Sequence, residues 1–213
     1  MTKEMIRIAN CSGFYGDKLS VAKDMVEGGP IDVLTGDYLA ELTMTILYNQ
    51  KIKRGEDHGY VGTFLKQFKD VAKSTQEKNI KIVSNAGGLN PKAMALEVEK
   101  IIDELNLKLK VAYIEGDDLI PEFQKLSEAG EKFKNLDNEI NLSDYPKKPI
   151  TANAYLGAWG IKEALDNGAD VVICPRVTDA AVVIGPAAWK FNWSRDQYDA
   201  VSYTHLTLPT KCS

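Results

Sequence analysis

The feature that most constrains the fold is a regular alternation of short apolar runs with longer segments of helical period. The runs are rich in Val and Ile, and they cover residues 5–10, 31–36, 80–85, 110–116 and 170–174. In the segments between them, apolar residues recur three and four positions apart. This pattern is typical of βα units, which stack into a parallel sheet. We therefore predict an α/β fold with a mainly parallel, Rossmann-like sheet and helices on both faces, with a closed barrel as the alternative.

Two of the segments show clear helix signals. Residues 59–79 place their apolar side chains on one stripe and their lysines on the rest, which predicts a helix lying on the sheet; the stripe is Val61, Phe64, Leu65, Phe68, Val71 and Ala72. Pro91 suits the first turn of the next helix, where a missing N–H group costs nothing. Gly168 suits the left-handed position that follows a helix.

The size of the chain favours one domain. With 213 residues, 44% of them hydrophobic, it can bury one α/β core. We assign residues 1–200 to the amino-terminal part of this domain, which we expect to be incomplete at its C-terminus. Residues 201–213 carry no periodic pattern, so we treat them as a non-native tail and leave them out of functional reasoning. The charged stretch 127–149 is long for a connection, and is either a surface excursion or a mobile lid.

Charge and cysteine content narrow the class of protein. The formal net charge is −4, and acidic and basic residues are interspersed along the chain. This distribution does not indicate a nucleic-acid-binding protein. No segment reaches the roughly 18 apolar residues of a membrane span, and we expect a cytoplasmic protein. Cys11, Cys174 and Cys212 are widely spaced, which supports neither a disulfide framework nor a zinc site. Cys174, inside an apolar run, is expected to be a small buried hydrophobe.

Polar residues, with two glycines among them, follow every predicted strand. They are Asn10, Ser12, Tyr15 and Asp17; Thr35, Asp37 and Glu41; Asn85, Gly87, Gly88 and Asn90; Glu115, Asp117 and Asp118; and Arg176, Thr178 and Asp179. The carboxyl ends of parallel strands lie along one edge of a sheet, where ligands bind. The sequence therefore predicts one site at this edge, although Asp37, Asp118 and Asp179 could each simply cap a helix.

The acidic run Glu115-Gly-Asp117-Asp118 is the first candidate for chemistry. Three carboxylates this close repel one another unless a metal ion, an arginine or a ligand offsets their charge. One of them, with a pKa raised by its neighbours, could move a proton. Asp37 is a further catalytic candidate. A divalent cation held by Glu115, Asp117 and Asp37 is the less favoured alternative.

Arg176 is the strongest candidate for binding a substrate. Its planar guanidinium recognises a carboxylate or a phosphate through paired hydrogen bonds. An internal ion pair with Asp179 or Asp170 explains it equally well. Gly87 and Gly88 precede a helix and could accept an anion there, but no complete phosphate-binding fingerprint is present. His58 stands in a polar loop, so a nucleophilic triad with Cys11 or Ser12 is not favoured.

Several longer motifs resemble a known family. "IRIANCSGFYGDKLS", "GGPIDVLTGDYLAELTM", "NAGGLNP", "VAYIEGDDL", "TANAYLGAWGI" and "RVTDAAVVIGPAAWKFNW" are similar to the acyclic terpene utilisation AtuA family. The resemblance covers Met5 to Trp193, and because members of that family are longer, it implies an amino-terminal fragment. It implies no established reaction. It adds Asn153 to the candidate residues listed above.

The resemblance implies a role in the breakdown of citronellol and geraniol type terpenes through acyl-CoA intermediates. We expect an enzyme that acts on a branched carboxylate, either free or linked to CoA. The alternative is a non-catalytic subunit that binds an acyl-CoA or assists a carboxylase. The expected partners are a small-molecule substrate and either a carboxylase or a second copy of the chain. The sequence identifies no cofactor.

Overall fold

The computed structural model describes residues 5–197 of the protein. Five strands form one sheet in which all neighbouring strands are parallel. They are β1 (Ile8–Asn10), β2 (Val33–Gly36), β3 (Lys81–Ser84), β4 (Val111–Tyr113) and β5 (Val171–Ile173). Their order, β1-β2-β3-β5-β4, is that of an open sheet rather than a barrel. The predicted α/β fold with a parallel sheet is confirmed, and every predicted run contains a strand.

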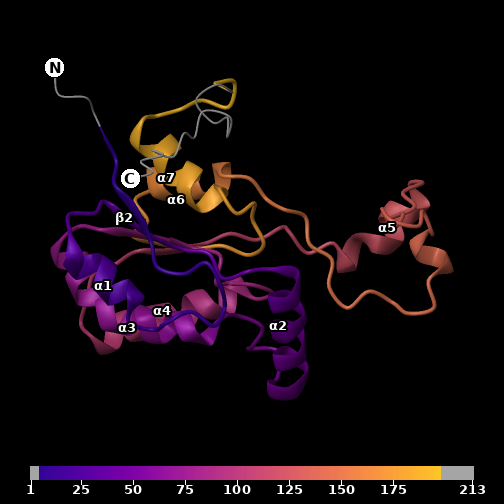
Figure 1. Cartoon of the computed structure of the whole chain (residues 1–213), viewed down its shortest axis with the longest axis horizontal. Helices are drawn as coiled ribbons and strands as arrows, with labels where there is room; N and C mark the ends of the chain where they lie inside the picture. The colour runs from indigo at the N-terminus through magenta and orange to yellow at the C-terminus, as the bar shows by residue number, and fades with distance from the viewer. Residues whose placement is uncertain (1–4, 198–213) are drawn as a thin grey trace, which may run out of the picture.

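Helices cover both faces of the sheet, as Figure 1 shows. One face carries α1 (Val21–Gly28), α3 (Gly62–Glu77) and α4 (Pro91–Glu104), and the other carries α6 (Trp159–Asp166) and α7 (Ala181–Lys190). The strands separate two apolar cores, because successive side chains of a strand point to opposite faces. In β2, Leu34 belongs to the core beneath α1, α3 and α4, and Val33 belongs to the core beneath α6 and α7.

The helix signals in the sequence are confirmed. In α3, the predicted stripe is buried except for the half-buried Leu65. Pro91 is the first residue of α4, and the Asn90 side chain caps this helix by accepting the Ala93 N–H at 3.1 Å. Gly168, with φ +83°, takes the left-handed conformation after α6. Cys174 is fully buried, as predicted.

The order of the strands reverses between β3 and β5. The chain passes from β3 through α4 to the outermost strand β4, and then returns through α6 to β5, which lies between β3 and β4. The segment after β3 therefore continues to one face of the sheet, and the segment after β5 continues to the other. In open α/β sheets, ligands bind in the crevice at such a switch point. Asn85 follows β3 there, and Arg176 follows β5.

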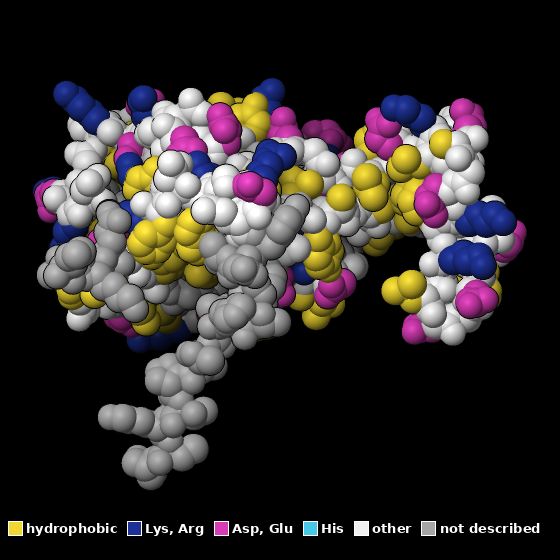
Figure 2. Space-filling view, turned by 90° about the horizontal axis from the view of Figure 1, so that it is seen from above, with side chains coloured by type: hydrophobic (Ala, Val, Ile, Leu, Met, Phe, Trp, Pro, Cys, Tyr) yellow, Lys and Arg dark blue, Asp and Glu magenta, His cyan; other side chains and the backbone are white. Residues whose placement is uncertain are grey.

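Two elements project from the same end of the domain in Figure 1. One is α2 (Glu41–Arg54). The other is the excursion between β4 and α6, residues 119–152, which we call the arm; it contains short helical segments at Ile120–Glu122, Phe123–Glu128 and Leu142–Asp144. At its base, Asp118 and Asn153 form an antiparallel bridge. The arm stands away from the sheet, which fits a surface excursion (Figure 2).

Within residues 5–197, no helix combines the length and the apolar character needed to cross a lipid bilayer. The segment 201–213, with His205 and Cys212, lies outside the described residues.

Candidate functional site

Three strands bring Asp37, Asn85 and Arg176 to the switch point. Asn85 is fully buried, and its side chain links the segments that follow β2 and β3. Its Nδ2 donates to Asp37 Oδ1 at 2.5 Å, and its Oδ1 accepts the Tyr38 N–H at 2.8 Å. These residues, distant in the sequence, therefore lie together at the carboxyl ends of the strands, as predicted. Asn85 holds the Asp37 carboxylate in place.

Asp37 is a half-buried carboxylate beside two other charges. Burial raises the pKa of Asp37, and the nearby Asp179 carboxylate raises it further. The Asn85 hydrogen bond and the Arg176 guanidinium act in the opposite direction but do not cancel the effect. A carboxyl group with a raised pKa, open to solvent on one side, is suited to accept and return a proton.

Arg176 is buried, and its guanidinium is held on several sides. Its carbon Cζ lies 4.0 Å from the centroid of the Tyr155 ring, a cation–π contact. Nη1 donates to Asp179 Oδ1 at 3.0 Å and to the Val177 carbonyl at 3.1 Å. Nη2 lies 4.0 Å from Glu41 Oε1. The internal ion pair with Asp179, one of the two interpretations of Arg176, is therefore present.

Tyr155 is the site residue that the sequence analysis missed. Its hydroxyl donates a hydrogen bond to Glu41 Oε1, and this bond lowers the pKa of Glu41. Tyr155 reaches Arg176 because Leu156 bridges with Val177, which lays residues 155–156 beside the segment after β5. The only signal in the sequence was an aromatic residue within the motif that contains Asn153.

Asp117 is the buried member of the acidic run, and it positions other groups. Its Oδ2 accepts Nδ2 of Asn153 at 2.7 Å and the backbone N–H of Arg176 at 3.2 Å. Burial raises the pKa of Asp117, against the effect of these hydrogen bonds. Asp117 therefore ties the base of the arm to the start of the Arg176 segment.

The other two acids of the run point elsewhere. Asp118 is exposed, and its Oδ1 accepts the Ile120 N–H at 2.9 Å, as in an Asx turn. Glu115 is exposed as well. Over the described range 5–197, no three His, Cys, Asp or Glu side chains are grouped as metal ligands would be. The alternative of a cation held by Glu115, Asp117 and Asp37 gains no support from this arrangement.

The loop 85–90 is packed against its neighbours. A Cβ on Gly87 would lie 2.6 Å from the Cys174 carbonyl, and one on Gly88 would lie 2.3 Å from Leu47 Cδ1. The backbone N–H groups of residues 86–90 all donate within the protein, to Ser84, Cys174, Asn85, Gly59 and Gly87. The glycines therefore allow close packing, and these N–H groups are not free to hold a phosphate.

The residues after β1 form a network of their own. Asn10 Nδ2 donates to the Ser12 carbonyl at 2.9 Å, and Thr35 Oγ1 donates to Asn10 Oδ1 at 3.1 Å. Asp17 Oδ2 accepts the Gly13 N–H at 2.8 Å. The network meets the candidate site through the Asp37 N–H, which donates to the Ser12 carbonyl at 2.8 Å. These side chains support the backbone that carries Asp37.

Three remaining candidates take minor positions. Thr178 is half-buried, and its N–H donates to the Leu156 carbonyl at 2.9 Å. Tyr15 accepts a hydrogen bond from Gln50 at 3.0 Å. Cys11 is buried, which raises its pKa, so its thiol is not poised as a nucleophile.

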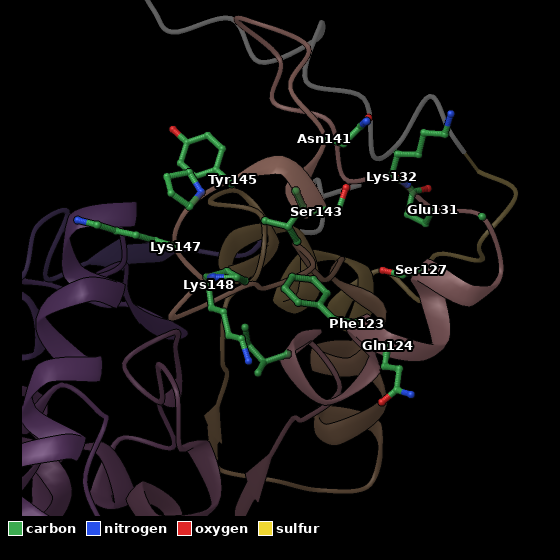
Figure 3. A pocket seen from close by; sticks show the side chains of 15 residues that line it. Phe123, Gln124, Ser127, Glu131, Lys132, Asn141, Ser143, Tyr145, Lys147 and Lys148 are labelled. Atoms are coloured by element: carbon green, nitrogen blue, oxygen red, sulfur yellow. The ribbon is translucent and has the colours of Figure 1, made fainter.

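An open hollow of about 920 Å³ lies within the arm rather than at the switch point. Figure 3 shows Phe123, Gln124 and Ser127 on one side of it and Ser143 and Tyr145 on another. A second hollow of about 520 Å³ shares Leu142, Tyr145, Lys147 and Lys148 with the first.

One comparison with known proteins identifies the family. The family model described as "Acyclic terpene utilisation family protein AtuA" matches residues 6–206. The comparisons with curated proteins and with solved structures gave no match. The match spans the whole sheet, the arm and every residue of the candidate site, and the chain therefore belongs to the acyclic terpene utilisation family AtuA.

Proposed function

We propose that the protein acts in acyclic terpene breakdown by binding a branched carboxylate, free or as its CoA ester, at the switch point and moving a proton on it. The family supports a role in terpene utilisation. The observation that carries the rest is the pairing of a buried, stacked Arg176 with a half-buried Asp37 whose pKa is raised by burial.

Arg176 is suited to bind the carboxylate or the thioester carbonyl of the ligand. Its present ionic partners are surface groups, because the side chains of Asp179 and Glu41 are 70% and 82% exposed. The hydrogen bond from Arg176 Nη1 to Asp179 Oδ1 is partly buried. A ligand carboxylate that replaces Asp179 at Nη1 would keep the buried guanidinium paired with an anion, and the exposed Asp179 side chain would turn to solvent.

Asp37 is the candidate for proton transfer, and Asp117 is a positioning residue. Asp37 lies near Arg176, whose positive charge acts to lower the pKa of Asp37. Asp117 has its Oδ2 engaged by Asn153 and by the Arg176 N–H. Replacing Asp37 with Asn keeps the volume of the side chain but removes the base, and general acid–base catalysis typically contributes about 10²- to 10⁴-fold.

Binding is tested by the unfolding midpoint of the protein with branched terpenoid acids and their CoA esters. A ligand at about 100 times its Kd adds roughly 2.7 kcal/mol to the free energy of unfolding. We expect a raised midpoint with at least one ligand, and loss of this effect in Arg176→Ala. Arg7→Ala is the matched control, because Arg7 pairs with Asp32 at the amino ends of the strands, away from the candidate site. A midpoint that no acid or ester changes would contradict the proposal.

Turnover then distinguishes an enzyme from the alternative of an acyl-CoA-binding or carboxylase-accessory subunit. Each bound ligand is incubated with the protein, and products are sought by mass spectrometry together with exchange of deuterium from solvent. We expect product or exchange that falls at least 10²-fold in Asp37→Asn while the ligand still raises the unfolding midpoint. Binding without either signal would favour the accessory subunit.

A further inference from the structure

The arm lacks a core of its own. None of the residues 119–152 is buried, although the arm contains an aromatic pair, Phe123 and Phe133, with ring centroids 4.8 Å apart. The two hollows lie within it, and Figure 3 shows the one of about 920 Å³. A segment this short cannot bury enough apolar surface to hold a fixed shape alone. A second surface is needed to cover it.

The tip of the arm, residues 136–140, combines apolar and acidic side chains. Leu136 is 98% exposed and Ile140 is 42% exposed. Between them stand Asp137 and Glu139, both exposed, in a turn held by Asn135 Oδ1, which accepts the Asp137 N–H at 2.9 Å. Exposed apolar residues gathered beside charges are typical of a contact surface.

The last turn of α2 presents an apolar and basic surface, which we call the outer face of α2. Ile52 is 67% exposed there, and its neighbours Lys53 and Arg54 are exposed as well. Nearer the start of the helix, Thr43, Met44 and Leu47 bury its inner face. The outer face is complementary to the arm tip, with an apolar group to meet Leu136 and cations to meet Asp137 and Glu139.

We propose that a second copy of this chain covers the arm, with the tip of each arm docked on the outer face of α2 in the other copy. Figure 1 shows the arm and α2 at the same end of the molecule. A two-fold axis that passes between the arm and α2 makes two identical contacts, as isologous dimers do. Charge complementarity between tip and helix selects a second copy as the occupant.

The first test is the oligomeric state of the protein by light scattering and sedimentation. We expect a dimer at micromolar concentration. Leu136→Asp should give a monomer with an unchanged unfolding midpoint at low protein concentration, because an exposed Leu136 contributes nothing to the fold of one copy. Leu96→Asp is the matched control, since Leu96 is 51% exposed on α4, and it should remain a dimer.

The second test reverses charges. Two double variants should each raise the dimer dissociation constant at least tenfold. One combines Asp137→Lys with Glu139→Lys, and the other combines Lys53→Glu with Arg54→Glu. Mixing these two variants should restore a heterodimer, because each tip then meets an α2 of opposite charge in both contacts. Reversal of Lys66 and Lys92, exposed on α3 and α4, should leave the dimer intact.

A wild-type protein that is monomeric at all accessible concentrations would overturn the proposal. So would a dimer that survives Leu136→Asp and both reversals, since its interface would then lie elsewhere. Two reversed variants that remain monomers when mixed would also overturn it.

Discussion

The guanidinium carbon of Arg176 lies 4.0 Å from the centroid of the Tyr155 ring, and this contact forms one wall of the candidate site. Arg176 follows the interior strand β5, and Tyr155 follows the base of the arm. Their contact therefore joins the sheet to the arm at the point where the order of the strands reverses.

Replacing Tyr155 tests this contact. Tyr155→Ala removes the ring from Arg176 and should lower the free energy of unfolding by about 0.5–2 kcal/mol, the range of cation–π contacts. Tyr155→Phe keeps the ring and loses only the hydrogen bond to the exposed Glu41, so its effect should be smaller. Urea unfolding measures both. Equal effects of the two variants would show that the stacking contributes little.

Replacing Asp117 or its neighbour Asp118 with Ala should lower the free energy of unfolding by different amounts. Asp117→Ala leaves the Arg176 N–H and the Asn153 amide without their acceptor, which should cost about 1–3 kcal/mol. Asp118→Ala removes a carboxylate from an exposed turn, where one hydrogen bond contributes about 1 kcal/mol. The comparison of the two unfolding free energies is the measurement. A larger loss at Asp118 would contradict the structure.

Asp37 and Asp32, which flank β2, should make contributions to stability that depend on pH in opposite directions. Burial raises the folded-state pKa of Asp37, so its contribution is most favourable below the unfolded value of about 4 and is lost as the pH rises through the folded pKa. Asp37→Asn should therefore stabilise the protein at neutral pH, with a gain that fades in acid.

Asp32 is the control with the opposite sign. Its hydrogen bonds with Arg7 lower its folded-state pKa, so its contribution is present above the unfolded value and is lost as the pH falls through the folded pKa. Asp32→Asn should destabilise the protein slightly at neutral pH, because the pair is exposed. Thermal unfolding from about pH 3 to pH 8 follows both variants.

Gly87 should tolerate no side chain. A Cβ there would lie 2.6 Å from the Cys174 carbonyl and 2.7 Å from Pro91 Cβ, so Gly87→Ala should lower the free energy of unfolding by about 1–3 kcal/mol. Gly13 has no heavy atom within 4 Å of such a Cβ, and Gly13→Ala should be nearly neutral. A neutral Gly87→Ala, measured by urea unfolding, would show that the loop between β3 and α4 can move.

The strands and helices could be predicted because their signals are local. The apolar stripe of α3, Pro91 at the start of α4 and Gly168 after α6 each reflect a backbone preference within one or two turns. The gathering of Asp37, Asn85 and Arg176 at one edge followed from a general property of parallel sheets. The strand order, and with it the switch point between β3 and β5, depends on pairing between distant segments, which no local pattern records.

The roles within the acidic run could not be assigned from the sequence. Asp117 and Asp118 are neighbours of the same type, yet one is buried and the other exposed, because consecutive side chains of an extended segment point to opposite sides. Which of them faces inward is decided by the bridge between Asp118 and Asn153.

The sequence by itself determined the α/β class, the helices and strands, and the edge at which the polar residues gather, because periodicity and turn residues act over short distances along the chain. Only the tertiary structure decided that Asp117 supports Arg176, that Tyr155 stacks on it, and that Asp37 is the half-buried acid beside it. These roles depend on burial and on contacts such as the bridge between Leu156 and Val177. They form when segments far apart in the sequence pack together.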